Sequence, residues 1–439
     1  LPFQGHKDNH SGLMTQAQMA AYQKTMGVPA GEEWAPFAGL PREPDEYRAF
    51  LERVPFGARA PTPPAPRIEV PAAGAFPRPT GKQSTQGAFG RILNDLARAG
   101  APLADAIVTT SPDVTVSTNL GAFVNQRGLF AREAHADTFR DAAIASTQRW
   151  AMGPKGQHIE LGIAENNLFL MLGALGLTAD LFGARLMPVG ALYDPFINRG
   201  LDALNYACYQ DARFLLAATP SGLTLAPEGG AHQSIHTPLI GMAQAGLSAF
   251  EPAFVDELSE IMRWSFDHLQ AQDGGSVYLR LSTRVLDQPE REVSEAWTRQ
   301  LIDGAYWQVE PEPGAELAVV YAGAVAPEAA SALAAIREDY PGAGLLAVVS
   351  PDRLHRGWSA AGGRSHAAHL LARLVERARL ITVIDGPPAT LSWLGGVAGH
   401  QVRALGVEAF GQSGEIDDLY RAYRLDAEAI LDAAAQALL

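Results

Sequence analysis

Several features that mark particular protein classes are scarce or missing in this sequence. The chain has a single cysteine, Cys208, so it cannot form an internal disulfide; we expect a buried packing thiol in a reducing compartment. The longest apolar run, residues 168–177, is about half of the roughly 20 residues that a membrane-spanning helix needs. The first residues lack the basic and apolar regions of a secretion signal. We therefore expect a cytoplasmic protein with no membrane partner.

Positive charge is also scarce. The formal net charge is -14, and no cluster of Lys and Arg is visible, which argues against nucleic acid as a partner because phosphate contacts need such clusters. What is present is ordinary globular composition, with 47% hydrophobic and 19% charged residues. A chain of 439 residues is long enough for two or three hydrophobic cores.

The first 83 residues differ in composition from the rest. Residues 12–28 are predicted to form a helix with Thr15 as its N-cap, and residues 43–54 a second, weaker helix. Residues 55–83 are rich in proline and predict a linker or a strap along the surface. We expect residues 1–54 to be the tail of an upstream domain that lies outside this chain.

From residue 84 the pattern changes to short apolar strands separated by helices, which is typical of α/β domains with parallel sheets. We predict two consecutive three-layer domains, residues 84–292 and 293–439, preceded by the helical and proline-rich arm. The predicted strands fall at residues 106–110, 186–189, 214–218, 248–252, 277–281, 317–321, 344–349 and 380–384, and the predicted helices include 85–99, 327–340, 365–379 and 426–439. Ligands of such folds bind at the carboxyl ends of the strands.

Glu165 is the most informative residue of this part. It is the single carboxylate at the start of the otherwise apolar helix that includes residues 168–177. Burying a carboxylate is costly and favours a retained or shared proton, so a ligand or a catalytic step is a good reason to keep one there. A favourable interaction with the helix N-terminus is the simpler alternative.

Three further segments concentrate polar groups. Residues 227–236 form a Gly-rich turn with Glu228, His232 and His236, which suits proton transfer or substrate contact; zinc is a weaker alternative because the motif lacks the glutamate of metalloproteases. Residues 5–10 contain His6 and His10. Residues 111–120 follow a predicted strand and hold Asp113 where a ligand could reach it. Each segment could also be an ordinary solvated loop, and none predicts a metal site within this chain.

In combination these segments resemble those of the thiamine diphosphate enzymes of the transketolase and 2-oxoacid dehydrogenase superfamily. Residues 161–167 resemble the surroundings of the glutamate in its pyrimidine-binding domain. Four other segments resemble, in turn, the region after the diphosphate-binding domain, the cofactor-facing aspartate loop, the Glu/Asp-Gly-x-x-His loop and the C-terminal Phe-Gly-x-Ser segment: residues 5–10, 111–120, 228–236 and 409–428. All five stand in the order of the family, and the resemblance leaves out only the proline-rich segment.

The resemblance implies a cofactor and roles for these residues. Glu165 would hydrogen-bond N1' of the aminopyrimidine of thiamine diphosphate and promote its imino form. Tyr193 or Phe196 would stack on the pyrimidine ring. The implied cofactor-binding residues are Glu165, Asp113, Tyr193, Phe196 and Glu228, and the implied catalytic residues are Glu165, His232, His236, His6 and His10.

Two details favour the 2-oxoacid dehydrogenase branch. Pro220 stands where transketolases have a histidine that helps to bind a sugar phosphate. The four-residue spacing of His232 and His236 resembles that of the homodimeric pyruvate dehydrogenase first component. This branch implies decarboxylation of a pyruvate-like 2-oxoacid through an enamine and acyl transfer to a lipoyl group. The alternatives are transketolase-type ketol transfer between sugar phosphates and a non-catalytic structural subunit.

The sequence departs from the family pattern in two ways, and the first points to a missing half. The sequence has no Gly-Asp-Gly followed by a distant Asn, the element that holds Mg2+ and the diphosphate. We therefore expect these ligands on an upstream segment or a separate chain, in a homodimer or heterotetramer. The helix at residues 12–28 lacks the histidine that assists transfer to the lipoyl group in the pyruvate enzyme, so a lipoyl-bearing acyltransferase partner is inferred from the branch.

Overall fold

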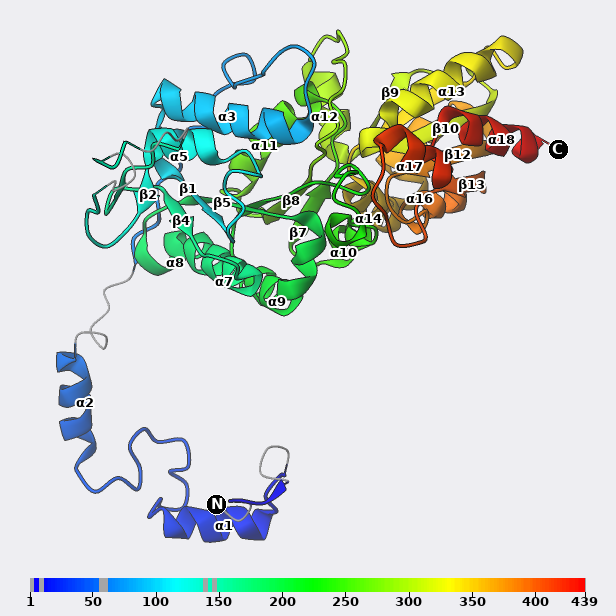
Figure 1. The fold of residues 1–439 in the computed structure, drawn as a ribbon. Helices are drawn as coiled ribbons and strands as arrows, with labels where there is room; N and C mark the ends of the chain where they lie inside the picture. Colours follow the sequence, from blue (N-terminus) through cyan, green and yellow to red (C-terminus); the bar gives the residue numbers. More distant parts are fainter. Residues whose placement is uncertain (1–3, 8–11, 55–61, 137–140, 144–147, 439) are drawn as a thin grey trace. The chain divides into compact units, whose positions relative to one another are not determined.

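The computed structural model describes residues 4–7, 12–54, 62–136, 141–143 and 148–438 (Figure 1). The chain divides into two compact units, residues 1–63 and 64–439, which are described separately. His10 lies outside the described residues.

The first unit contains two short helices, α1 (Gln16–Thr25) and α2 (Pro44–Arg53), at the positions where helices are predicted. Thr15 caps α1 in a capping box with Gln18, which confirms the predicted N-cap. Neither helix has a buried residue. The described part of this unit therefore has no hydrophobic core of its own beyond contacts such as the stacking of Phe37 on Tyr47.

The second unit begins with an eight-stranded sheet in which every pair of neighbouring strands is parallel. Its strand order is β3-β2-β4-β1-β5-β6-β8-β7. The strands are β1 (Ile107–Ser111), β2 (Leu129–Phe130), β3 (Met152–Gly153), β4 (His158–Glu160), β5 (Met187–Leu192), β6 (Leu215–Ala218), β7 (Leu247–Phe250) and β8 (Ser276–Arg280). Strands are thus confirmed at each predicted run, and β5 to β8 are buried at every position because both faces of the sheet are covered.

Helices cover both faces of this sheet (Figure 1). On one face lie α3 (Thr85–Ala99) and α11 (Val255–His268), and on the other α7 (Glu165–Gly176) and α9 (Leu201–Tyr209). Ser84 caps α3, and Gly100 ends it at φ 65°, a left-handed conformation that glycine adopts without a Cβ clash. Cys208 is buried in α9 as predicted, and burial raises the pKa of its thiol to about 11.

The proline-rich residues from 64 onward lie along α11 as a strap. Arg67 pairs with Asp267 at 2.6 Å, and Arg78 pairs with the buried Glu260 at 3.0 Å. Phe76, near the end of the strap, is buried in the main core. These contacts agree with a surface strap for the described part of the proline-rich segment. Its prolines disfavour a helix or a central strand, so side-chain contacts attach it to α11.

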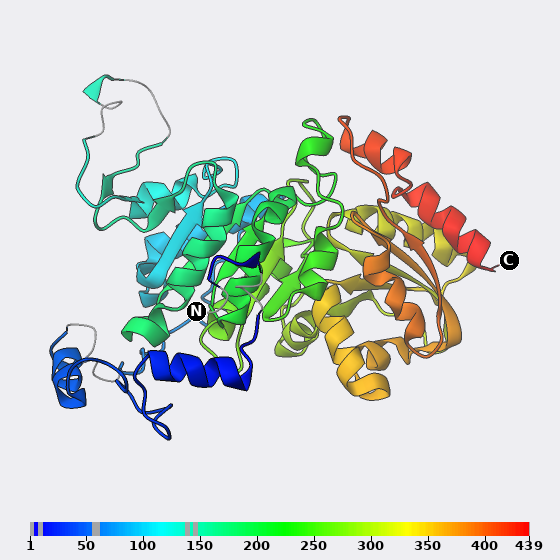
Figure 2. The same cartoon turned by 90° about the horizontal axis from the view of Figure 1, so that it is seen from below.

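A second, five-stranded sheet lies beside the first (Figure 2). Its order is β13-β12-β10-β11-β9, with strands β9 (Ala305–Val309), β10 (Ala315–Ala322), β11 (Gly344–Val348), β12 (Leu374–Ile384) and β13 (Gln401–Leu405). The edge strand β9 runs antiparallel to β11, an exception to the predicted parallel arrangement of a kind that is common at the edges of α/β sheets. The fold class is otherwise the predicted one.

The predicted helix at residues 365–379 is wrong in its second half. The helix α15 (His366–Leu371) ends early, and β12 begins at Leu374. Residues 375–377 are exposed and charged or weakly apolar, so the sequence there carries no alternation that would indicate a strand. Leu374 pairs with Ala315 of β10, and regular pairing resumes only at Arg379, so residues 375–378 form an irregular stretch of the strand.

The remaining elements connect these layers. They are α4 (Pro102–Ala106), α5 (Gly121–Arg127), α8 (Thr178–Phe182), η2 (Asp194–Gly200), η3 (Gly230–His232), α10 (Thr237–Ala243), α12 (Glu295–Asp303), η4 (Gly323–Val325), α13 (Ala326–Asp339), α14 (Pro351–Ala361), η5 (Gly362–Arg364), α16 (Ala389–Ser392), η6 (Trp393–Gly396), α17 (Ile416–Ala422) and α18 (Ala427–Leu438). One continuous hydrophobic core includes buried residues of both sheets, from Ile92 of α3 to Ile430 of α18. Within the described residues, no helix combines the length and the apolar character needed to cross a membrane.

Candidate functional site

The predicted site segments follow the carboxyl ends of four neighbouring strands. Asp113 comes after β1, Glu165 after β4, Tyr193 directly after β5, and the Gly-rich turn after β6. These strands are adjacent in the order β4-β1-β5-β6. Parallel strands present their carboxyl ends at one edge, so the fold gathers the four segments at the edge where α/β proteins bind ligands.

Glu165 is the first residue of α7, and its side chain is 8% exposed. The position at a helix N-terminus favours its negative charge. Sequence reasoning predicted this buried acid but missed its partner: Arg199, near the end of η2, donates a hydrogen bond to Oε1 of Glu165. The carboxylate is therefore paired with a guanidinium whose side chain is half exposed.

A cluster of aromatic rings lies next to Arg199. Its guanidinium carbon lies 3.7 Å from the ring centroid of Phe196, which makes a cation–π contact. The Phe196 ring lies 5.7 Å from the His232 ring, and Tyr193 lies 5.7 Å from His232 and 5.9 Å from Phe196, between ring centroids. Both predicted stacking candidates thus border the same histidine, and both are partly exposed.

The two histidines of the Gly-rich segment have different partners. His232 Nδ1 lies 3.5 Å from the carboxylate of Glu228, and His236 Nε2 lies 3.0 Å from Oδ1 of Asn198 in η2. His232 ends η3 whereas His236 precedes α10, so they do not share the helical face that the zinc alternative needs. Among the described residues, no group of three or more His, Cys, Asp or Glu is arranged to hold a metal ion.

A cavity of about 870 Å³ opens beside His236, between the Gly-rich segment and two loops of the second sheet. Its apolar lining includes Pro195, Ile235 and Phe410, and its polar lining includes His236 and Glu408. None of the described residues that line it is Lys or Arg. The cavity thus offers no permanently charged cation, and Glu408 adds a negative charge.

Asp113 lies apart from the ring cluster. It has a positive φ of 62°, its side chain is exposed, and its backbone N–H donates to Oε1 of Glu160 at 2.8 Å. Glu160 also accepts from Thr115 at 2.7 Å. Burial would raise the pKa of Glu160, but hydrogen bonds from His158, Thr115 and backbone amides outweigh it and lower the pKa to about 2. Glu160 fixes the turn that carries Asp113, and sequence reasoning missed it.

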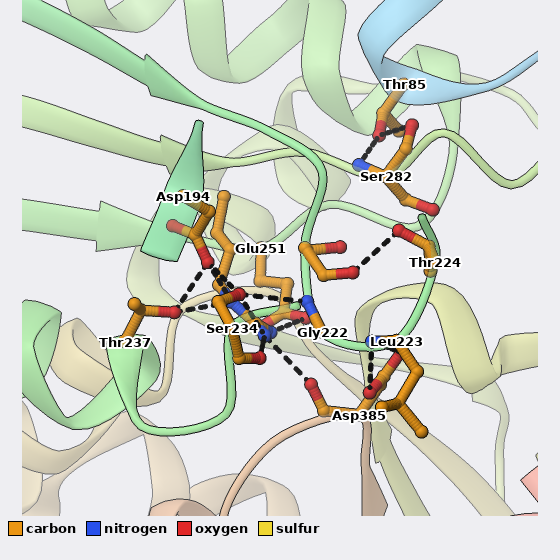
Figure 3. Close-up of polar contacts among 12 residues, drawn as sticks. Thr85, Asp194, Gly222, Leu223, Thr224, Ser234, Thr237, Glu251, Ser282 and Asp385 are labelled. Atoms are coloured by element: carbon orange, nitrogen blue, oxygen red, sulfur yellow. Dashed lines mark hydrogen bonds and ion pairs between the residues drawn. The ribbon is translucent and has the colours of Figure 1, made fainter. Parts of the chain in front are cut away.

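A second group that sequence reasoning missed is a buried charged network behind the site (Figure 3). The guanidinium of Arg280 contacts the carboxylates of Asp194 and Glu251. It also donates to the backbone carbonyl of Asp385 at 2.9 Å. Burial raises the pKa of Glu251 to about 7 and that of Asp385 to about 6, although Arg280 opposes both shifts.

The structure thus brings together most of the predicted site residues. Arg199, Phe196 and His232 link Glu165 to Glu228, while His236 reaches the same segment through Asn198. His6 belongs to the first unit. A signal for Arg199 was available in the sequence, since it follows Phe196 by three residues, a spacing that brings side chains together on a 3₁₀ turn.

Comparisons with known proteins identify similar proteins for most of this chain. Residues 81–288 match the family "Transketolase, pyrimidine binding domain". The pyruvate dehydrogenase E1 component of Mycolicibacterium smegmatis is 27% identical over 306 residues, which are 64% of this chain and 32% of the relative. A transketolase structure from Leishmania mexicana is similar with a TM-score of 0.64 and 18% identity, over 84% of this chain and 48% of that one.

The chain is short relative to these proteins. It spans about a third of the curated relative and about half of the transketolase structure. A structure titled "Split gene transketolase, inactive beta4 tetramer" has a comparable extent: the similarity covers 82% of this chain and 99% of that one, with a TM-score of 0.56 and 17% identity. At these identities the solved structures establish a shared fold.

Proposed function

Because the chain belongs to the transketolase and 2-oxoacid dehydrogenase superfamily of thiamine diphosphate enzymes, we propose that it is the pyrimidine-binding and C-terminal part of a 2-oxoacid dehydrogenase first component. A single observation carries the proposal. The carboxylate of Glu165, buried at a helix N-terminus, is linked through Arg199 to a row of partly exposed rings that ends at His232. We assign residues 84–292 to the pyrimidine-binding domain and residues 293–439 to the C-terminal domain.

The donor set fits the aminopyrimidine end of thiamine diphosphate. Glu165 supplies a carboxylate that can accept a hydrogen bond from a ring nitrogen, and Tyr193 or Phe196 supplies a flat apolar face. When bound, the thiazolium ring of the cofactor acts as an electron sink for decarboxylation. The carboxylate of Glu165 would hold the proton shared with N1', and Asp113 and Glu228 would border the cofactor.

The histidines suit the substrate side of this site. His232 is held by Glu228, and His236 by Asn198, so each imidazole has a fixed orientation at the edge of the rings. We assign to His232 and His236 the movement of protons to and from the substrate carbonyl. A catalytic role for His6 and His10 is proposed from the family resemblance alone.

The diphosphate and Mg2+ need ligands from elsewhere, and we propose that they come from a diphosphate-binding domain on an upstream segment or a separate chain. Apolar side chains are exposed on α7, α8 and α9, at Leu170, Phe182, Tyr206 and Tyr209. Exposure of such a patch is typical of a surface that a partner covers. A homodimer or heterotetramer would supply that cover.

The cavity beside His236 disfavours the doubly charged phosphate of a sugar phosphate more than it disfavours the single carboxylate of a 2-oxoacid. A phosphate group needs cationic or multiple N–H donors, and none of the described lining residues is Lys or Arg. Pro220, which stands in the place of a transketolase histidine, is buried and cannot donate. We therefore propose a pyruvate-like substrate, with acyl transfer to the lipoyl group of an acyltransferase partner.

The experiment is a two-way assay of the chain with its diphosphate-binding half, thiamine diphosphate and Mg2+. Decarboxylation of small 2-oxoacids is followed with an artificial electron acceptor, and acyl transfer is followed with lipoamide; ketol transfer is measured between two sugar phosphates. We expect turnover of a 2-oxoacid and none of the sugar phosphates. Ketol transfer alone would establish the transketolase alternative, and inactivity of the complete assembly in both assays would favour a structural subunit.

A further inference from the structure

Asp194 joins the two segments that carry the proposed site. It directly follows Tyr193, and its side chain is fully buried. Its Oδ2 accepts hydrogen bonds from Thr237 Oγ1 at 2.6 Å and from Ser234 Oγ. Ser234 and Thr237 flank His236 in the Gly-rich segment, and Figure 3 shows both side chains pointing toward the Asp194 carboxylate. One carboxylate thus fixes the ring-bearing segment, residues 193–199, to the histidine-bearing segment, residues 228–236. The contacts around Asp194 are called the junction below.

Arg280, at the end of β8, hydrogen-bonds to both segments that meet at the junction. Its Nε donates to Asp194 at 3.1 Å, and its Nη2 donates to the backbone carbonyl of Ser234 at 3.1 Å. Its Nη1 pairs with Glu251. The side chain of Arg280 is 2% exposed, so these contacts are shielded from solvent.

Asp385 extends the junction to the second sheet. Its carboxylate accepts from the backbone N–H of Leu223 at 2.9 and 3.0 Å and from the hydroxyl of Tyr420 at 3.0 Å. Gly222, next to Leu223, donates its N–H to Ser234 Oγ at 3.1 Å. The carbonyl of Asp385 accepts from Arg280, so the residue that follows β12 contacts Leu223 directly and reaches the histidine-bearing segment through Arg280 and Gly222.

Stability alone is a weak reason for such a network. Apolar residues of similar volume would often stabilise a fold as well as buried ion pairs, whereas buried ions fix one geometry. The junction also lies at the carboxyl ends of β5, β7, β8 and β12, directly behind the proposed site. By contrast, the hydroxyl of Tyr306 in β9 donates a hydrogen bond to Glu257 of α11. This contact also joins the two domains, but it involves no residue of the site segments.

We propose that Asp194 and Arg280 are positioning residues that hold the ring-bearing residues 193–199 against the histidine-bearing residues 228–236. Asp385 ties this junction to the C-terminal domain, which thereby supports the site. The expected loss of activity rests on the proposed function, whereas the expected change in the position of the histidine rings does not. A direct readout of the histidine rings therefore separates the two.

The first test is NMR of the full chain with isotope-labelled histidine. Signals of His232 and His236 are assigned with His232→Gln and His236→Gln. In Asp194→Asn we expect both signals to shift or broaden, while the signals of His355 and His366 in the second domain stay in place. Ser234→Ala removes one donor and keeps the test available if Asp194→Asn does not fold. Tyr306→Phe is the matched control, and it should leave the His232 and His236 signals unchanged.

The second test is activity in the complete assembly. Because misplacement of catalytic groups by about 1 Å can cost a hundredfold, we expect Asp194→Asn or Ser234→Ala to lower kcat about tenfold or more, with KM changed less than threefold. Arg280→Lys should recover part of the activity that Arg280→Met loses. The proposal is overturned if His232 and His236 signals and kcat stay at the wild-type values in folded Asp194→Asn and Ser234→Ala. Moved signals in an assembly whose wild type is inactive would retain the positioning and reject the proposed function.

Discussion

Arg199 donates a hydrogen bond to the buried carboxylate of Glu165 while its guanidinium stacks on the ring of Phe196. The proposed activator therefore already has a charged partner, on the same segment as the proposed stacking rings. Half of the Arg199 side chain is exposed, so it can leave the carboxylate without breaking the core. In this arrangement the guanidinium of Arg199 balances the negative charge of the Glu165 carboxylate.

Removing Arg199 should destabilise the chain. Arg199→Met leaves a buried carboxylate without its donor, and we expect the free energy of unfolding to fall by about 1–2 kcal/mol in urea titrations. Combining it with Glu165→Gln should restore part of the loss, because the uncompensated charge is then absent. Arg299→Met is the control, since its pairing with Glu295 is exposed on both sides and should contribute little. Equal effects of the two arginine variants would contradict this account.

Gly222 should not tolerate a side chain. It has a φ of 54°, and an added Cβ would lie 2.2 Å from the carboxylate of Asp385. We expect Gly222→Ala to lower the free energy of unfolding by about 2–4 kcal/mol, from backbone strain and the displaced carboxylate together. Gly100→Ala shares a positive φ of 65° but meets no atom within 4 Å, and it should cost about 1 kcal/mol. Similar losses in both variants would mean that contact with Asp385 is unimportant.

Stability should fall as pH rises toward neutrality. Burial raises the pKa of Glu251 from 4.5 to about 7, so its favourable contribution is complete below pH 4.5 and is lost as pH rises through 7. The loss is roughly 3 kcal/mol for a shift of this size. Chemical unfolding at pH 5, 6, 7 and 8 measures it. Glu251→Gln should flatten the dependence, and an unchanged slope would show that Glu251 does not titrate in this range.

Glu160 should act in the opposite direction at low pH. Its pKa is lowered from 4.5 to about 2, so its contribution is present above pH 4.5 and is lost as pH falls toward 2. We expect Glu160→Gln to cost about 1–2 kcal/mol at pH 7, after allowance for solvent screening, and much less at pH 3. Unfolding titrations at the two pH values provide the measurement, and an equal cost at both would contradict the assignment.

Much of the fold followed from local sequence patterns. The apolar runs of β5, β6 and β8 are buried on both faces, so their pattern marks strands directly. The first half of β12 could not be predicted in this way, because residues 375–377 are exposed and lie in an irregular stretch between Leu374 and Arg379, the residues that pair with β10. The antiparallel β9 likewise depends on a neighbour distant in the sequence.

The site residues divide in the same way into those that local sequence predicts and those that only tertiary contacts reveal. Glu165 and the histidines stood out because charged or titratable groups in apolar or Gly-rich surroundings are unusual. Arg280 did not stand out, since its partners Asp194, Glu251 and Asp385 come from three distant segments. A network assembled by tertiary packing leaves no local spacing to detect.

The central claim is that Glu165 activates thiamine diphosphate in a complete assembly. Its most direct test is the rate of 2-oxoacid decarboxylation by Glu165→Gln, measured with the diphosphate-binding half, the cofactor and Mg2+ present. Loss of the activating carboxylate should lower kcat by about a hundredfold to a thousandfold. A variant that is folded, binds the cofactor and turns over within a few-fold of the wild type would contradict the account.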